Sequence, residues 1–63
     1  MPVVRIDDEI RQNDLNNGRT IAVSEIFEEG VICQAVLTDG ALLAIGSWQS
    51  GKLKPDKVFK VGE

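Results

Sequence analysis

Short apolar runs separated by acidic-glycine steps occupy the centre of the chain, between residues 20 and 46. The two steps are Glu29-Gly30 and Asp39-Gly40. Glycine reaches positive φ without steric cost, and acidic residues suit the turn positions before it. The pattern therefore predicts a three-stranded antiparallel meander over about residues 20–46.

Side-chain parity across the two turns selects the loop length. With three-residue loops that end in a glycine bulge, Phe27 faces Val31, and Leu37 faces Ala41, so all odd positions share one face. Two-residue loops would make both faces comparably apolar, whereas an antiparallel meander favours burial on one side. Glu25 is the only polar member of this odd face. The predicted inward set is otherwise apolar: Ile21, Val23, Phe27, Val31, Cys33, Ala35, Leu37, Ala41, Leu43 and Ile45.

The even face of the same meander carries apolar clusters that point to solvent. In this register Ile26 faces Ile32. Val36 faces both Ala22 and Leu42. A contiguous exposed apolar patch indicates a partner surface. The alternatives are that the N-terminal segment folds over the patch, or that two copies pair through it as a homodimer.

The segment before the meander predicts extended pieces and loops. Residues 3–6 form a short extended run, and residues 7–11 hold no helical period of useful length. We therefore expect a strand, a turn and a second extended piece. Residues 12–19 are dense in turn formers and predict an ordered loop with Leu15 packed beneath it.

The segment after the meander predicts a short helical turn and a closing strand. The helical turn is expected near residues 47–53, and the strand over the alternating run at residues 57–61. Trp48 and Leu53 are large apolar groups in a polar connector, so we expect them to cap one end of the core.

The residue types exclude several kinds of site. With 63 residues, the chain has room for one domain and one small core, so residues 1–63 are taken as a single domain. There is no His, and Cys33 is the only cysteine, which leaves no disulfide, no metal-ligand set and no Ser-His or Cys-His pair. The glycines form no phosphate-cradling motif. We expect no catalytic residue, no cofactor and no metal, and Cys33 as a packed thiol.

The charge balance disfavours a general nucleic-acid binder. Seven Lys and Arg stand against ten Asp and Glu, for a formal charge of −3. The basic residues gather late in the chain, at Lys52, Lys54, Lys57 and Lys60, as a solvated rim or a weak anion-binding strip. No secretory signal or membrane span is present, so a cytoplasmic protein without membrane contact is expected.

The order of elements carries a resemblance over nearly the whole chain. Residues 6–11 lie at the position of an entry strand, and residues 17–19 end the polar loop that follows. Residues 53–55 precede a closing strand with Phe59 and Val61. This arrangement resembles small SH3-like barrels of the Tudor or KOW kind. The resemblance implies an all-β, five-stranded barrel.

A second similarity rests on the Asn13-Asp14 and Gly18-Arg19 steps. These steps look similar to short uncharacterised proteins of bacteria and their phages. That similarity implies a phage or prophage-encoded inhibitor or adaptor of host machinery.

A different resemblance is confined to residues 45–56, which look like the recognition-helix end of Cro and repressor-type helix-turn-helix proteins. It implies a helix-turn-helix over roughly residues 31–51. Residues 31–36 are rich in β-branched side chains, which favour a strand there instead.

Our main hypothesis is a non-enzymatic protein-interaction module that binds another protein or a second copy of itself. The alternative is a nucleic-acid-binding transcriptional regulator that uses the Lys52–Lys60 edge or the helix-turn-helix. The predicted partner-binding residues are Ile26, Ile32, Val36, Leu42 and Trp48.

Overall fold

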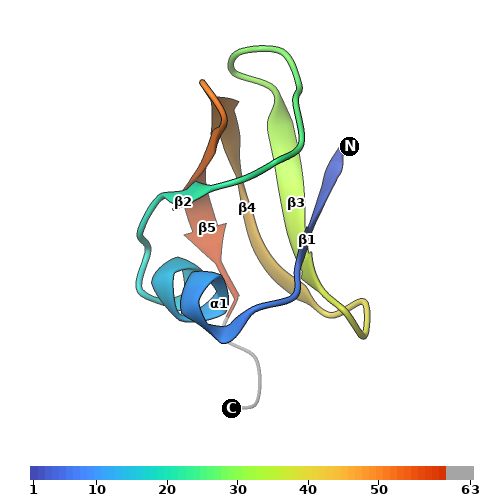
Figure 1. Cartoon of the computed structure of the whole chain (residues 1–63), viewed down its shortest axis with the longest axis vertical. Coiled ribbons are helices and arrows are strands. Elements are labelled where there is room, and N and C mark those ends of the chain that lie inside the picture. The colour runs from blue at the N-terminus through green and yellow to red at the C-terminus, as the bar shows by residue number, and fades with distance from the viewer. Residues whose placement is uncertain (60–63) are drawn as a thin grey trace.

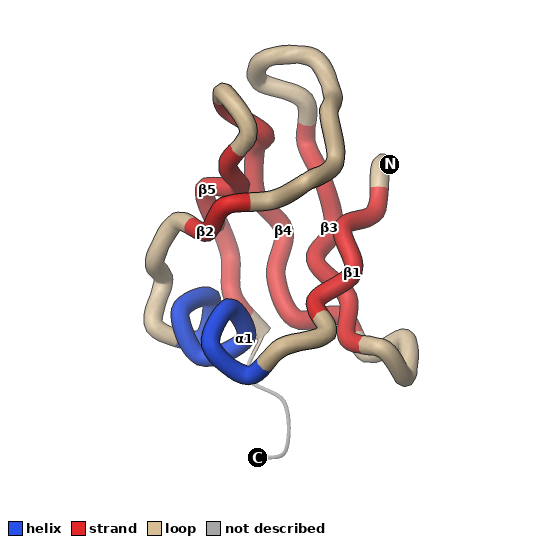
Figure 2. Tube along the Cα trace, in the orientation of Figure 1, coloured by secondary structure: helices blue, strands red, loops and turns tan. Residues whose placement is uncertain are grey.

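The computed structural model describes residues 1–59 as a small curled sheet with one short helix (Figures 1 and 2). Within these residues the elements are β1 (Val3–Ile6), α1 (Glu9–Asn16), β2 (Ile21–Ala22), β3 (Ile32–Leu37), β4 (Leu42–Gln49) and β5 (Lys52–Val58). The five strands form one sheet in the order β1-β3-β4-β5-β2, which curls into a half-barrel. The prediction of a small, mostly β, barrel-like fold is confirmed at this level.

The turn between β3 and β4 is the predicted three-residue loop. Gly40 has a φ of 89°, and its N–H donates to the Leu37 carbonyl at 2.9 Å. The Leu37 N–H donates in turn to the Ala41 carbonyl at 2.9 Å, so Leu37 faces Ala41 as expected. The Asp39 carboxylate accepts a hydrogen bond from the Ala41 N–H, which explains the acidic residue before the glycine.

A bulge in β4 changes the side-chain parity beyond this turn. Val36 pairs with Leu42, but Ala35 pairs with Ala44, so Leu43 is an extra residue on β4. Leu43 and Ala44 are both fully buried. From this point the even positions of β4 point inward. Ile45, predicted to point inward, instead pairs with Gln34 on the other face, and that prediction is wrong.

The predicted meander over residues 20–46 is also wrong in its first strand. β2 has only two residues, and it pairs with β5 through Ile21 opposite Leu53. The edge of β3 is taken instead by β1, which runs parallel to it. This pairing is favoured because it buries Val4 and Ile6 against the core.

Residues 23–31 form an irregular segment that crosses from β2 to β3 (Figure 1). A turn is present at its predicted end, where the Val31 N–H donates to the Glu28 carbonyl at 3.1 Å. The Gly30 N–H donates to the Trp48 carbonyl of β4 rather than to a neighbouring hairpin strand. The predicted cross-strand pair of Ile26 and Ile32 therefore does not form.

The helix α1 replaces the extended piece and loop predicted for residues 7–19. Asp8 is its N-cap and accepts a hydrogen bond from the Arg11 N–H at 3.0 Å. Gly18, with a φ of 74°, follows the helix end, and its N–H donates to the Leu15 carbonyl. Leu15 is fully buried, as expected, whereas Ile10 is 77% exposed. One buried side chain produces no apolar period, which is why the pattern did not predict a helix.

The helical turn predicted near residues 47–53 is wrong, because β4 continues through Gln49 and β5 begins at Lys52. Ser50 and Gly51 join the two strands with φ values of 50° and 81°, as in the tight turns of two-residue hairpins. The predicted closing strand overlaps β5 at residues 57–58, and residues 60–61 lie outside the described part of the chain. Strands over residues 32–49 also contradict the helix-turn-helix.

The core lies inside the curl. Trp48, 7% exposed, donates from Nε1 to the Glu25 carbonyl at 2.9 Å. The Phe27 ring meets it edge to face, with centroids 6.5 Å apart. Trp48 and Leu53 are therefore core residues, as predicted. The buried cluster consists of Val4, Ile6, Leu15, Ile21, Cys33, Ala35, Leu43, Ala44, Trp48 and Leu53.

At Gly46, the backbones of β4 and β5 lie too close together to leave room for a side chain. The pairing shifts from Ile45 opposite Lys57 to Gly46 opposite Pro55, which leaves Asp56 as an extra residue on β5. A Cβ on Gly46 would overlap the Lys54 carbonyl and would lie 2.9 Å from the Pro55 Cα. Since these atoms belong to the backbone, they cannot move aside as a flexible side chain could.

We predict that Gly46→Ala lowers the free energy of unfolding by about 3 kcal/mol, the upper end of the usual cost of overpacking. Gly18→Ala is the control, because a Cβ there meets no atom within 4 Å. It should cost only the left-handed conformation, about 1 kcal/mol. Urea denaturation followed by circular dichroism measures both. A Gly46→Ala variant as stable as the original chain would contradict the close approach.

Candidate functional site

The face of the sheet that points away from the core is the largest surface that the sequence singled out. Its members follow from the strand pairing, because residues opposite each other on neighbouring strands share a face. We call it the outer face, and it consists of Val3, Arg5, Ile32, Gln34, Val36, Leu42, Ile45, Ser47, Gln49, Lys52, Lys54 and Lys57.

The helix and the crossing segment pack on the other side of the sheet. α1 contacts β4, β5 and β2 and contributes Leu15 to the core. Val23, Phe27 and Val31 of the crossing segment also pack against the core cluster. The outer face consequently keeps aliphatic side chains in contact with solvent, with Val3 and Ile32 each 43% exposed.

Three of the five predicted partner-binding residues lie together on the outer face. Val36 and Leu42 are direct neighbours on β3 and β4, and Ile32 lies four residues along β3 from Val36. Val36 is only 9% exposed, although it does not belong to the core cluster. Ile26, 85% exposed, lies on the crossing segment, away from this strand register. Trp48 points into the core, so it contributes nothing to the outer face.

Val3 and Ile45 belong to the outer face but were not predicted there. Val3 pairs with Gln34, and Gln34 pairs with Ile45, so the three side chains form one row across the sheet. The bulge at Leu43 reversed the direction assigned to Ile45. Exposed and buried residues alternate in β1, as in a strand with one buried face. The residues near β1 in the sequence do not indicate that β3 is its partner.

Four cations border these aliphatic residues. Lys52, Lys54 and Lys57 project from β5, and Arg5 projects from β1 at the opposite margin. All four are exposed. Within residues 1–59 the ion pairs form at Arg11 and Arg19 and at none of these four. Since the whole chain has a formal charge of −3, the outer face is basic on an acidic molecule.

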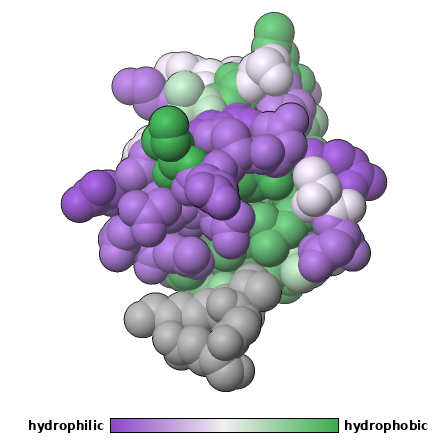
Figure 3. Space-filling view, turned by 60° about the horizontal axis from the view of Figure 1, so that its bottom comes forward, coloured by the Kyte–Doolittle hydropathy of each residue, from purple (hydrophilic) through white to green (hydrophobic). Residues whose placement is uncertain are grey.

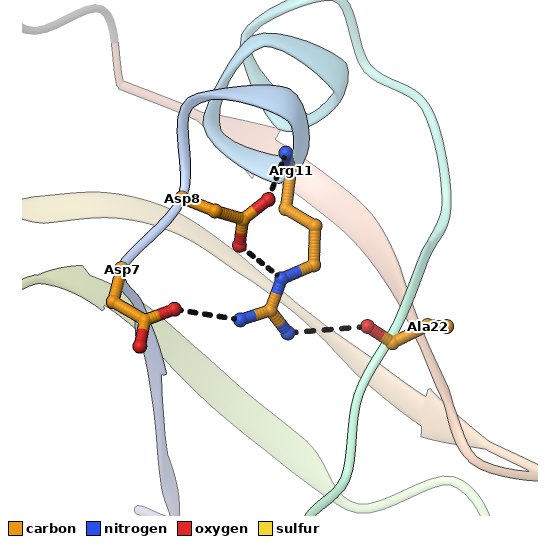
Figure 4. A network of polar contacts seen from close by, with 4 residues as sticks. All are labelled: Asp7, Asp8, Arg11 and Ala22. Carbon is orange, nitrogen blue, oxygen red and sulfur yellow. Dashed lines mark hydrogen bonds and ion pairs between the residues drawn. The ribbon is translucent and has the colours of Figure 1, made fainter.

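A polar network at the start of α1 joins the two ends of the sheet (Figure 4). The Arg11 guanidinium donates from Nε to Asp8 Oδ1 at 2.6 Å and from Nη2 to Asp7 Oδ1 at 3.3 Å. Its Nη1 donates to the Ala22 carbonyl of β2 at 3.2 Å. Asp7 and Asp8 directly follow β1, so Arg11 connects the two edge strands, which are not paired with each other.

The hydrogen bond from the Arg11 side chain holds the pKa of the Asp8 carboxyl below its ordinary value of 3.8. The same hydrogen bond raises the pKa of Arg11. A carboxylate bound in this way is a poor base at neutral pH, since its proton affinity is reduced. The network therefore has the properties of a structural clamp.

A hollow lies against the exposed side of α1, lined by Glu9, Ile10, Gln12, Asn13 and Asn16. Figure 3 looks toward this end of the molecule and shows a mainly hydrophilic surface with separate apolar patches. The Asn16 Oδ1 atom is buried without a hydrogen-bond partner in the described residues. Glu9 is the only ionisable side chain of the lining, so the hollow offers no acid–base pair.

Cys33 is fully buried, as predicted, and its thiol points to the Val31 carbonyl at 3.7 Å. Burial raises its pKa, and the negative charge of Glu25 adds to the effect. Over residues 1–59 no three potential ligand side chains gather into a metal-binding group. In the same residues, no helix has the length and apolar character needed to cross a membrane.

Comparison of the chain with protein-family models, with curated proteins and with solved structures found no match.

We predict that Asp8→Asn lowers stability at neutral pH but loses this effect in acid. Because the folded pKa lies below 3.8, the Asp8 carboxylate stabilises the fold above about pH 4. This contribution is lost as the pH falls through the folded pKa. The urea midpoints of the two proteins should therefore converge in acid. A difference that stays constant down to pH 2 would contradict the role of the Asp8 charge.

We also predict that iodoacetamide modifies Cys33 more than about tenfold more slowly in the native protein than in denaturant, because both burial and the raised pKa suppress the thiolate. Mass spectrometry of timed samples gives both rates. Equal rates would show that β3 does not protect the thiol.

Proposed function

We propose that this chain is a non-enzymatic interaction module that binds a protein through the outer face of its sheet. The observation that carries the proposal is the composition of this face. Aliphatic side chains of β3 and β4 lie at its centre, where Ile32 is 43% exposed, and exposed cations lie on the two flanking strands, Arg5 beside Val3 on β1 and three lysines on β5. Protein interfaces combine an apolar centre and a polar rim in the same way.

The proposal of a non-enzymatic module is supported by the state of two side chains that could take part in catalysis elsewhere. The Asp8 carboxylate is held by Arg11, and the Cys33 thiol is buried. The hollow beside α1 contains one ionisable group. These groups do not form the nucleophile and base, or the pair of free carboxylates, that general acid–base or covalent catalysis requires.

We further propose that the half-barrel is a divergent SH3-like barrel. Five curled strands and a sheet bent by two bulges support this relationship. The similarity to short phage proteins adds that the module is an adaptor or inhibitor of host machinery, working in the cytoplasm.

The charges of the outer face favour a partner other than a second copy. In a symmetric dimer the same patch meets itself. Pairing two outer faces would therefore place Arg5 and the three lysines of one copy against those of the other. Like charges at close range oppose association, so these charges favour a different protein over a second copy as the partner.

Photo-crosslinking in cells that encode the protein tests the proposal. With a benzophenone amino acid at Ile32, we expect one discrete crosslinked species that contains another protein. The same probe at Ile10, which is 77% exposed on α1, is the control and should yield no such species. An identical set of products from both positions, or none from Ile32, would contradict binding through the outer face. A product of twice the chain mass would favour the homodimer.

A further inference from the structure

We infer that the partner of the outer face is an acidic polypeptide segment that carries aliphatic side chains between its carboxylates. This inference rests on the proposed function and names the chemistry that the same surface recognises. It depends on where the cations lie relative to the aliphatic centre, and on the positions and ion pairs of the other charged residues.

The cations occupy both margins of the outer face, with the aliphatic side chains between them. β1 and β5 are separated by β3 and β4 in the sheet, which places the two strands about 14 Å apart at the usual strand spacing. Along β5, Lys52, Lys54 and Lys57 form a column that borders Gln49, Ser47 and Ile45 respectively. A segment that runs along the aliphatic side chains from Leu42 to Ile32 would have Arg5 on one side, at the Leu42 end, and the lysines of β5 on the other.

These cations have no acidic partner in the described part of the chain. Arg11 and Arg19, by contrast, are bound by Asp7, Asp8 and Asp14. Of the remaining acidic residues, Glu9, Glu25 and Glu28 lie at the start of α1 and in the crossing segment. Glu29 accepts hydrogen bonds from Ser50 in the β4–β5 turn, and Asp39 lies in the β3–β4 turn. Asp56, the bulged residue of β5, is the one acidic side chain within that strand. Among residues 1–59, the four cations of the outer face thus form no ion pair, and a carboxylate-bearing partner would neutralise their charge.

The uncharged residues of the outer face favour a polypeptide over a nucleic acid. Single-stranded nucleic acids bind surfaces where successive bases stack on aromatic rings. Trp48 belongs to the core and Phe27 packs against it, while the Phe59 ring centroid lies 5.3 Å from Lys57 Nζ, so the described residues provide no row of open rings. Aliphatic side chains such as Val3, Ile32 and Ile45 suit apolar side chains of a peptide instead.

Selection from a random dodecapeptide library on the immobilised full chain tests this inference. We expect the enriched peptides to combine Asp or Glu with Leu, Ile or Val. In ¹⁵N spectra of the labelled protein, they should shift the amides of β3, β4 and β5. Their affinity should fall severalfold between 50 and 300 mM salt, since charges at an exposed rim are screened.

Two matched charge reversals give the internal control. Lys54→Glu should weaken binding of the selected peptides by about tenfold or more, whereas Arg19→Glu, an equal change of charge away from the outer face, should leave it within about twofold. Lys54→Gln should give an intermediate loss. Proton spectra of each variant show whether the fold is retained.

Other results would overturn the inference in distinguishable ways. Neutral or basic peptides that shift the outer-face amides would refute the acidic partner and leave the interaction module standing. Peptides that map to another surface, or no enrichment at all, would refute both. Tighter binding of a random 20-nucleotide DNA or RNA than of any selected peptide at 150 mM salt would assign the cations to nucleic acid instead.

Discussion

The close approach of β4 and β5 at Gly46 is the constraint on which the rest of the structure depends. A sheet of this size buries enough apolar surface only if it curls, and curling requires the two strands to pack more tightly than a side chain allows. The bulge at Leu43 interrupts the β3–β4 pairing and the bulge at Asp56 interrupts the β4–β5 pairing, and both increase the bend. The same curl encloses Trp48 on one side and spreads the outer-face side chains on the other.

Local features of the fold were predictable from the sequence, whereas distant pairings were not. The turn at Asp39-Gly40 follows from the chemistry of two adjacent residues, and Leu37 opposite Ala41 follows from the turn. The bulge at Leu43 has no comparable local cause, because one inserted residue changes neither composition nor apolar content. It reversed the side assigned to Ile45. The partners of β1 and β2 depend on strands far away in the sequence.

The predicted partner-binding residues show the same contrast between local features and distant pairings. Val36 and Leu42 share the predicted face because they flank the turn whose geometry fixes their side, and Ile32 shares it because residues alternate regularly along β3. Ile26 was misplaced because the hairpin assumed after it, at Glu29-Gly30, does not form. Trp48 was identified as a core residue and also assigned to partner binding, and its burial separates these two roles. Helix α1 was missed because its stability comes from the Asp8 cap, the Arg11 contacts and one buried leucine.

The parallel pairing of β1 with β3 has a consequence for how the chain reaches its native state. The two hairpins that link β3, β4 and β5 join residues close in sequence, whereas Val3 must find Gln34 across the helix, β2 and the crossing segment. Closing so long a loop costs more entropy than closing a hairpin, so the N-terminal strand should dock last. Until it docks, the edge of β3 is open to strands of other molecules. Nascent or refolding chains are therefore most prone to misassembly during this interval.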